Sequence, residues 1–169
     1  MIRLATHDDL PALHALVESA YRGDSARGGW THEADLLEGQ RTSQAELAQV
    51  VADPDSRVLL MHRDGALIGP LIGTVTVTRR SGGIAYMGML CVDPALQAGG
   101  LGRSLIAAAE DCARRDFGAT IMEMTVVAPR TELVSYYERR GYAQTGEIRP
   151  FPLPQFDHLS MVVLTKALG

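Results

Sequence analysis

The sequence predicts a single-domain α/β protein. Its 169 residues fit one domain, and a chain of this size buries roughly 70% of the surface that its unfolded form exposes. Segments with apolar residues at helical spacing alternate with short apolar or strictly alternating segments, which indicates mixed helices and strands. Turn signals at Asp64-Gly65 and Ser81-Gly82-Gly83 predict hairpins in the first half. The expected order is β-α-α-β-β-β-α-β-α-β-β.

The chain is expected to open with a short strand at Ile2–Ala5 and a helix. The segment from Thr6 to Asp9 has the capping-box pattern, with Thr6 at the N-cap and an acidic residue three positions later. Apolar residues follow at helical spacing to about Tyr21. The next segment, Arg22–Thr42, is rich in glycine, charge and turn formers, and we expect it to be a long connection. Long ordered loops are often functional.

A second capping box, Ser43 to Glu46, predicts a short helix that ends at Asp53-Pro54-Asp55. Strands are then expected at Arg57–His62 and Leu67–Thr78. Gly69-Pro70 interrupts the second of these strands, which predicts a bulge or an edge position there.

The second half of the chain is expected to contain two apolar, buried strands, two helices and two closing strands. Gly141 stands at the position where a glycine commonly ends a helix. In chain order the expected elements are strand Ala85–Val92, a helix from Leu101 to about Asp116, strand Ala119–Val127, helix Thr131–Arg140, and strands Tyr142–Ile148 and Leu159–Lys166.

Composition excludes several classes of function. The formal net charge is −4 and the basic residues are scattered, which argues against nucleic-acid binding. The two cysteines, Cys91 and Cys112, have no CxxC spacing, so neither a metal site nor a redox motif is expected, and buried thiols in a reducing compartment are the better interpretation. No signal peptide and no apolar run long enough to span a membrane is recognised. These features predict a soluble, cytoplasmic protein.

Three glycines within four positions, Gly99, Gly100 and Gly102, lie between an apolar strand and a helix. The main-chain N–H groups at a helix N-terminus are unpaired and carry the positive end of the helix dipole. Glycines let these groups approach a phosphate without a Cβ in the way. The side chains of Arg103 and Ser104 can add donors. The alternative is a tight turn packed on the sheet. The Walker and dinucleotide patterns are not matched, because there is no Gly-Lys pair and the stretch is mid-chain.

Two motifs carry a family resemblance. Leu90-Cys-Val-Asp-Pro94 leads into Gln97, Gly100 and Gly102, which matches a strand followed by Q/R-x-x-G-x-G/A. Tyr136-Tyr137-Glu138 followed by Gly141-Tyr142 matches a later aromatic element. The sequence thereby resembles the GCN5-related N-acetyltransferase (GNAT) superfamily over nearly its whole length. The resemblance implies the GNAT fold, a mixed and mostly antiparallel sheet of about seven strands with a central splayed parallel pair and about four helices.

The resemblance implies acetyl-CoA as donor, with CoA as product. The pyrophosphate is expected on main-chain amides from about Ala98 to Arg103, and the pantetheine arm is expected to pair with the main chain of Leu90 and Val92. The parallel pair would be Ala85–Val92 and Ala119–Val127. The expected cofactor-binding residues are Leu90, Cys91, Val92, Gln97, Ala98, Gly99, Gly100, Leu101, Gly102, Arg103 and Ser104.

Direct acetyl transfer through a tetrahedral intermediate requires a neutral amine, a polarised carbonyl and a proton for the leaving thiolate. Tyr137 matches the family's tyrosine and is expected to be the proton donor; the alternative is an aromatic core residue. Glu123 lies on an otherwise apolar strand, so it either faces an open site as the base or pairs with an arginine. A water chain could also remove the proton.

The acceptor is expected to be a primary amine of a small molecule or a peptide. Trp30 either forms a wall of its pocket or pins the loop. Glu33, Asp35 and Glu38 form an acidic cluster that either attracts a cationic amine or belongs to a solvated loop. Arg130 stands where the family often has an asparagine that contacts the cofactor, and it could reach a phosphate instead. The resemblance also suggests a homodimer. The alternative functions are a non-catalytic CoA-binding or sensing module and a nucleotide-binding domain.

Overall fold

The computed structural model describes residues 2–27, 43–63, 69–151 and 159–169, and the side chains at 21–27 and 97–98 are not part of that description. One mixed sheet contains seven strands in the order β1-β2-β3-β4-β5-β7-β6. Only β4 and β5 are parallel neighbours. The predicted α/β class and the mixed sheet with one parallel pair are therefore confirmed.

The strands and helices follow the predicted order, with two added 3-10 turns. The strands are β1 (Ile2–Leu4), β2 (Ser56–His62), β3 (Leu71–Arg79), β4 (Ile84–Val92), β5 (Ile121–Val127), β6 (Ala143–Pro150) and β7 (Ser160–Ala167). The helices are α1 (Leu10–Arg27), α3 (Gln44–Ala52), α4 (Leu101–Phe117) and α5 (Thr131–Glu138), and the 3-10 turns are η1 (His7–Asp9) and η3 (Pro94–Gly99). No helix in these described ranges is long and apolar enough to cross a membrane.

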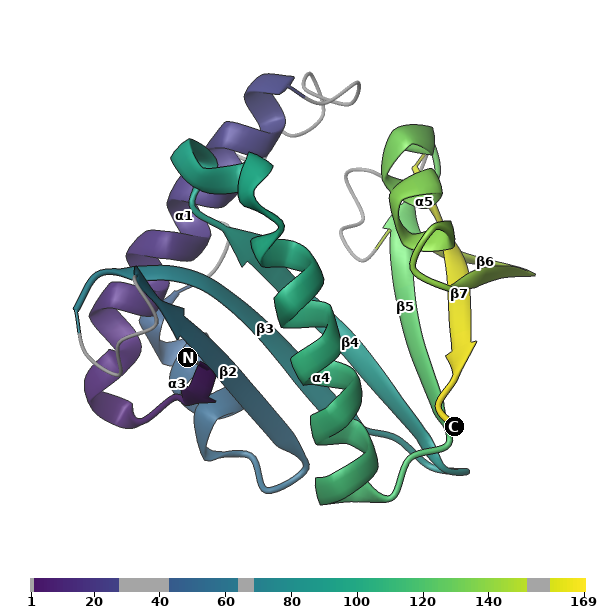
Figure 1. Cartoon of the computed structure of the whole chain (residues 1–169), viewed down its shortest axis with the longest axis horizontal. Coiled ribbons are helices and arrows are strands. Elements are labelled where there is room, and N and C mark those ends of the chain that lie inside the picture. The colour runs from purple at the N-terminus through teal and green to yellow at the C-terminus, as the bar shows by residue number, and fades with distance from the viewer. Residues whose placement is uncertain (1, 28–42, 64–68, 152–158) are drawn as a thin grey trace.

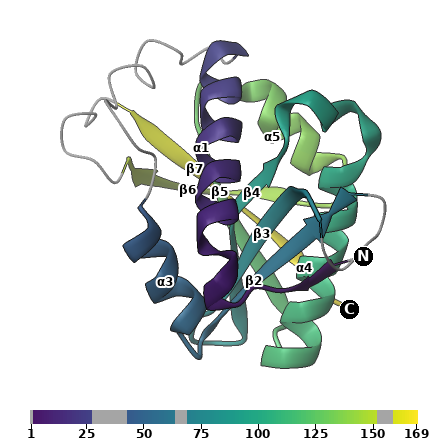
Figure 2. The same ribbon diagram turned by 90° about the vertical axis from the view of Figure 1, so that its left-hand side faces the viewer.

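Helices cover both faces of the sheet (Figures 1 and 2). On one face, Leu13 and Val17 of α1 and Leu47 of α3 pack on β2. On the other face, α4 and α5 cover the larger core cluster, which includes Leu105, Met122 and Tyr137. The capping predictions hold, since the Thr6 N–H donates to Asp9 at 2.7 Å and the Ser43 hydroxyl accepts from the Glu46 N–H at 3.1 Å.

Three features differ from the sequence prediction by more than a shift of one or two residues. The first helix was expected to end near Tyr21 but continues to Arg27, because α1 contacts β4 and η3, and this packing outweighs the poor helix propensity of Gly23 and Asp24. The strand expected from Leu67 begins at Leu71, because Pro70 has no N–H for the ladder and Gly69 has φ +117°. The expected turn at Asp64-Gly65 lies outside the described residues.

The third difference concerns β4, which was expected to be buried along its whole length. Ala85 and Met87 are buried, whereas every residue from Gly88 to Val92 is only half-buried. The cause is the loss of a neighbour. The β4–β5 ladder contains only the pairs Ile84↔Ile121, Ala85↔Met122 and Tyr86↔Glu123. Beyond these pairs the two strands separate, while β4 stays paired with β3 and β5 stays paired with β7 (Figure 1).

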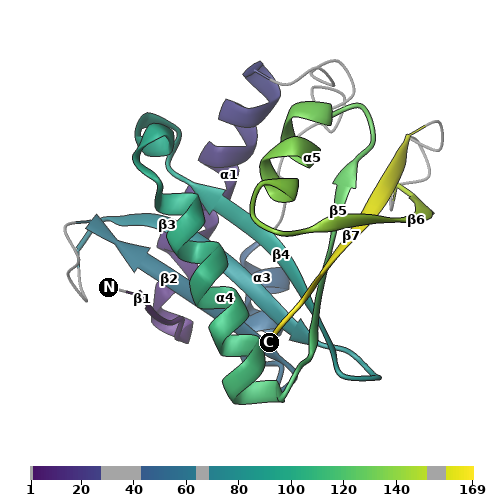
Figure 3. The ribbon, with the colours of Figure 1, turned by 45° about the vertical axis from the view of Figure 1, so that its right-hand side comes forward.

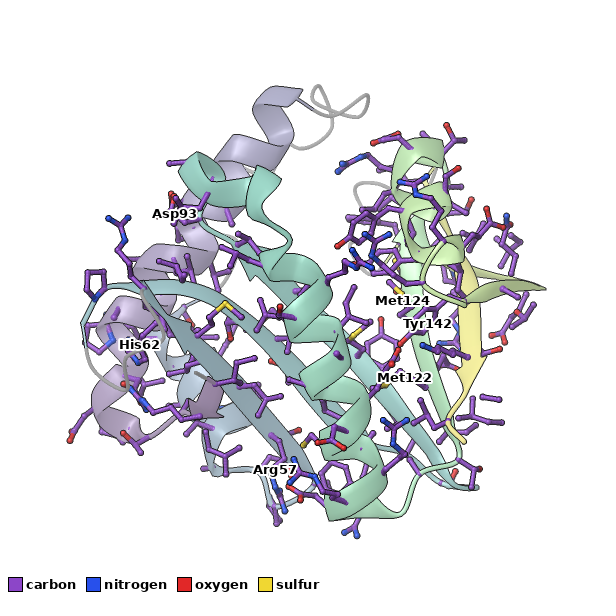
Figure 4. All side chains as sticks on the ribbon, in the orientation of Figure 1. Arg57, His62, Asp93, Met122, Met124 and Tyr142 are labelled. Atoms are coloured by element: carbon purple, nitrogen blue, oxygen red, sulfur yellow. The ribbon has the colours of Figure 1, made fainter. Side chains whose placement is uncertain are left out.

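A buried polar network joins α4 to Tyr142 and to β7, near the end of the sheet where β4 and β5 are still paired. Glu110 of α4 accepts a hydrogen bond from the Tyr142 hydroxyl at 2.9 Å and from Lys166 of β7 at 3.1 Å. Burial and the neighbouring carboxylate raise the pKa of Tyr142 well above its usual range, so the hydroxyl stays protonated and donates. Figure 4 places Tyr142 beside Met122 and Met124, between α4 and the strands β5 and β7. The network thus anchors α4 to β7.

At the other edge, the Arg3–Asp9 pair predicts a pH-dependent contribution to stability. Two hydrogen bonds from Arg3, at 2.7 and 2.9 Å, hold the pKa of Asp9 well below its usual range. A lowered folded-state pKa stabilises the fold above the unfolded pKa, and this contribution is lost as the pH falls. We expect Asp9→Asn to lower the free energy of unfolding by about 1 kcal/mol near neutral pH. The difference between wild type and variant should shrink as urea denaturation is repeated from about pH 7 to about pH 2; a difference independent of pH would contradict the assignment.

Candidate active site

The site begins with a bulge in β4. Thr74 pairs with Cys91 and Thr76 pairs with Gly88, so one residue of β3, Val75, faces two residues of β4. One of these two, Met89, has φ +51°, a left-handed conformation that L-residues other than glycine rarely adopt. Backbone outliers of this kind occur preferentially at functional sites. The bulge lies where β4 has already parted from β5.

The bulge changes which face of the sheet each side chain covers. Ala85 and Met87 belong to the core cluster under α4. Strict alternation would place Met89 and Cys91 on that same face, but both pack against the cluster under α1 instead. Leu90 and Val92 take their places under α4. Both side-chain rows of this half of β4 are used in packing, so the part that faces the separation from β5 is the main-chain edge opposite β3.

The glycine stretch forms a 3-10 turn and the first turn of α4. The Asp93 carboxylate accepts the Ala95 N–H at 3.0 Å, and Pro94 follows at the first position of η3. The main chain of Gln97 and Ala98 lies within η3, with Gly99 at its end. Gly100 has φ +75° and is the N-cap of α4. A left-handed residue at this point requires a glycine for conformational reasons.

Three main-chain donors open α4. The first main-chain bond along this helix runs from the Ser104 N–H to the Gly100 carbonyl, at 3.3 Å. The N–H groups of Leu101, Gly102 and Arg103, called here the α4 amides, have no acceptor within the helix. Gly99, Gly100, Arg103 and Ser104 are all exposed. Helix N-termini of this kind bind anions such as phosphate.

Tyr137 of α5 is almost fully buried, with 5% of its surface exposed. Its ring makes edge-to-face contacts with Tyr136 at 5.2 Å and with Tyr142 at 6.1 Å. Tyr136 in turn reaches Gly102, because a Cβ built on that glycine would lie 2.8 Å from the Tyr136 hydroxyl. The Tyr136 side chain therefore links the two sequence motifs, the glycine stretch and the aromatic element of α5. In Figure 3 the ribbons of α4 and α5 stay apart at this end, so the side chain spans the space between them.

Glu123 does not join this group. It lies on β5 in alternation with the buried Met122 and Met124, so it points to the opposite face. Its carboxylate accepts a hydrogen bond from Arg149 of β6 at 2.9 Å, and Arg149 also pairs with Glu147. Of the two outcomes expected from the sequence, pairing with an arginine is the one observed. These contacts raise the pKa of Arg149, which stays a cation.

Other predicted residues have different outcomes. Trp30, Glu33, Asp35 and Glu38 lie outside the described residues. Arg130 is buried, and its Nε donates to the Glu132 carboxylate at 2.6 Å. Cys112 is buried, which raises the pKa of its thiol to about 11, and Cys91 is half-buried. In the part of the chain that the structure describes, no three His, Cys, Asp or Glu side chains gather to hold a metal ion.

Sequence reasoning missed two features of this site. The Met89 bulge has no signal in the sequence, because nothing in the run Met87 to Val92 marks one residue as left-handed. The contact of Tyr136 with Gly102 was also missed, although the adjacent tyrosines could have indicated it.

The Tyr86 hydroxyl bonds the Thr125 hydroxyl at 2.7 Å, just beyond the last β4–β5 pair, and so ties the strands at the point where they part.

The fold and the site define a class of α/β proteins in which a parallel strand pair separates beside a glycine-capped helix. A model of the acetyltransferase (GNAT) domain family matches residues 31–163. This match covers more than half of the chain, and the chain belongs to the GNAT acetyltransferase family.

Known proteins agree with this assignment. The chain is 29% identical to an IAA acetyltransferase of Azospirillum brasilense over 103 residues, which cover 61% of this chain and 65% of that relative, less than two thirds of its length. The structure of PaiA N-acetyltransferase from Thermoplasma acidophilum, in complex with coenzyme A, superposes with a TM-score of 0.78 at 16% identity and covers 99% of this chain and 98% of that one. The ribosomal-protein-alanine N-acetyltransferase of Brucella melitensis superposes at 0.73 with 20% identity, and the match covers 99% of each chain. At these identities the structural matches show a shared fold.

The Gly102–Tyr136 contact predicts that Gly102→Ala destabilises the wild type but not a variant in which Tyr136 is phenylalanine. We expect Gly102→Ala to lower the free energy of unfolding by on the order of 1 kcal/mol, because the new Cβ meets a hydroxyl whose ring is packed against Tyr137 and Arg140. In a Tyr136→Phe background the ring carbon Cζ lies 3.9 Å from the new Cβ, so the helix preference for alanine should make the same change neutral or stabilising.

Denaturant unfolding of the four variants checks this thermodynamic cycle. Gly99→Ala is the control, since the nearest atom to its Cβ is 3.9 Å away. Equal effects of Gly102→Ala in both backgrounds would contradict the contact.

Proposed function

We propose that the chain is an acetyl-CoA-dependent N-acetyltransferase that moves an acetyl group directly to a primary amine of a small molecule or a peptide. The observation that carries the proposal is the separation of β4 from β5 after the Tyr86↔Glu123 pair, next to the α4 amides. Family membership supports the reaction class, and the similar PaiA structure contains coenzyme A.

The residues present fit the donor. Its pantetheine arm carries amide groups, which can pair with a strand edge as a further strand would. The edge from Leu90 to Val92 lies where β5 is no longer paired with β4. The pyrophosphate needs several donors and tolerates no Cβ close by, which the α4 amides and Gly99 to Gly102 provide. Acetyl-CoA supplies the thioester, and the chain supplies orientation and proton transfer.

A proton must leave the amine and a proton must reach the leaving sulfur. An alkylammonium has a pKa of about 10.4 and no lone pair, so the amine has to lose its proton before or during attack. We propose Tyr137 as the donor to the sulfur, since it lies on α5 beside Tyr136, whose hydroxyl reaches the α4 amides. A main-chain N–H of β4 near the bulge would stabilise the developing oxyanion.

The proton acceptor is proposed as Glu123 or as a water chain that its charge organises. Glu123 is 14% exposed, it pairs with Tyr86 at the last position before β4 and β5 part, and its carboxylate is shared with Arg149. This pairing fixes the direction of the carboxylate.

A ligand and turnover experiment tests the function. We expect acetyl-CoA and CoA, but not NAD or ATP, to raise the melting temperature. At about 100 times Kd the linkage free energy is about 2.7 kcal/mol, which corresponds to several degrees. We also expect CoA release when a panel of primary amines is added. A thermal shift without turnover on any amine would favour the non-catalytic binding module, and no shift in a folded sample would contradict donor binding.

Replacing Tyr137 by phenylalanine tests the proposed acid. We expect Tyr137→Phe to lower kcat about a hundred-fold or more with little change in the KM of acetyl-CoA, because a positioned acid acts only on the leaving group. Tyr142→Phe is the matched control, since it removes a hydroxyl that is directed to Glu110. Unchanged turnover in Tyr137→Phe would reject the role.

In the same assay, Glu123→Gln should flatten the rise of kcat/KM with pH if the carboxylate accepts the proton. A profile parallel to that of wild type would assign the step to water.

A further inference from the structure

Gly102, the third glycine of the stretch, makes room for a tyrosine side chain as well as for the approach of a phosphate. The Tyr136 hydroxyl lies 2.8 Å from the position of a Cβ on Gly102. Gly102 has no positive φ, so its backbone conformation does not require glycine. A glycine at this point therefore lets an α5 side chain approach the first turn of α4, and it brings a phenolic hydroxyl next to the α4 amides.

This hydroxyl has no hydrogen-bond partner among the residues that the structure describes. Tyr136 is half-buried, and the hydrogen bond that Arg140 gives to this residue goes to its main-chain carbonyl. A phenol that meets no protein acceptor is free to donate to a ligand at the adjacent helix end.

Arg140 adds a positive charge to the same place. Its guanidinium stacks on the Tyr136 ring at 3.7 Å and donates to the Tyr136 carbonyl at 2.9 Å. The Arg140 Nε is buried, and no described residue hydrogen-bonds it. The ring is thus packed by Arg140 on its face and by Tyr137 at 5.2 Å. Packing from both sides fixes the direction of the hydroxyl, and fixed donors bind at a lower entropic cost.

We infer that Tyr136 and Arg140 extend the α4 amides into a phosphate subsite for the donor, with the hydroxyl as a hydrogen-bond donor and the guanidinium as a positive charge. This inference rests on the proposed function, because the phosphate is that of the acetyl-CoA donor. A phosphate oxygen accepts several hydrogen bonds, and donors to an ionised group form stronger bonds than donors to a neutral one. The two α5 residues therefore determine affinity for the phosphorylated part of the donor and not for its acyl end.

The test measures the dissociation constants of CoA, 3′-dephospho-CoA and pantetheine by calorimetry for wild type and Tyr136→Phe. The phenylalanine keeps the ring, the stacking with Arg140 and the room at Gly102, so only the hydroxyl is lost. We expect about ten-fold weaker binding of CoA and an unchanged Kd for pantetheine, which has no phosphate. Arg140→Gln should weaken CoA binding in the same selective way and reduce its salt dependence.

The ligand series also identifies which phosphate is bound. An equal loss for CoA and 3′-dephospho-CoA assigns the subsite to the pyrophosphate, and a loss for CoA alone assigns it to the 3′-phosphate. Two matched controls remove similar groups elsewhere. Tyr142→Phe removes a hydroxyl bonded to Glu110, and Arg139→Gln removes an exposed cation one residue before Arg140. Both should bind CoA as wild type does.

Two results would overturn the inference. Wild-type CoA affinity in Tyr136→Phe would show that the hydroxyl does not touch the ligand. An equal loss for pantetheine would show that the substitution disturbs the site as a whole. These results are distinct from failure of the proposed function, in which wild type itself does not bind CoA and the subsite is rejected with it.

Discussion

The separation of β4 from β5 is the constraint on which the rest of the structure depends. A parallel pair inside a sheet normally satisfies the main-chain groups of both strands. Here the ladder ends after three pairs, and the Tyr86–Thr125 hydrogen bond marks the end. Each strand keeps its outer neighbour, so the sheet stays continuous while an inner edge becomes available.

The surrounding elements follow from this opening. The bulge at Met89 reverses the side-chain order of β4, so that Leu90 and Val92 stay in the core while the main chain faces the opening. Helix α4 follows β4 and η3, and the α4 amides lie at its first turn. The Tyr136 side chain contacts α4 at that end. Farther along the helix, Glu110 bonds Tyr142 and Lys166 and so joins α4 to β7.

Much of the fold could be predicted from local sequence alone. The capping residues Thr6 and Ser43 start their segments as expected, because a cap needs only partners three residues away. Gly141 follows the last helix with φ +96°, as its lack of a Cβ allows. The two motifs around Gly100 and Tyr137 were sufficient to predict the family, which the domain match confirms. Boundaries set by distant packing, such as the end of α1, were wrong.

The sequence by itself determined which segments are helices and strands, where they are capped, and that a glycine stretch opens a helix after an apolar strand. These properties depend on interactions within a few residues. Only the tertiary structure decided that β4 is bulged and parted from β5, that Glu123 is held by Arg149, and that Tyr136 rests on Gly102. Each of these contacts joins residues far apart in the chain, and its formation depends on the packing of the whole sheet, which no local pattern of residues encodes.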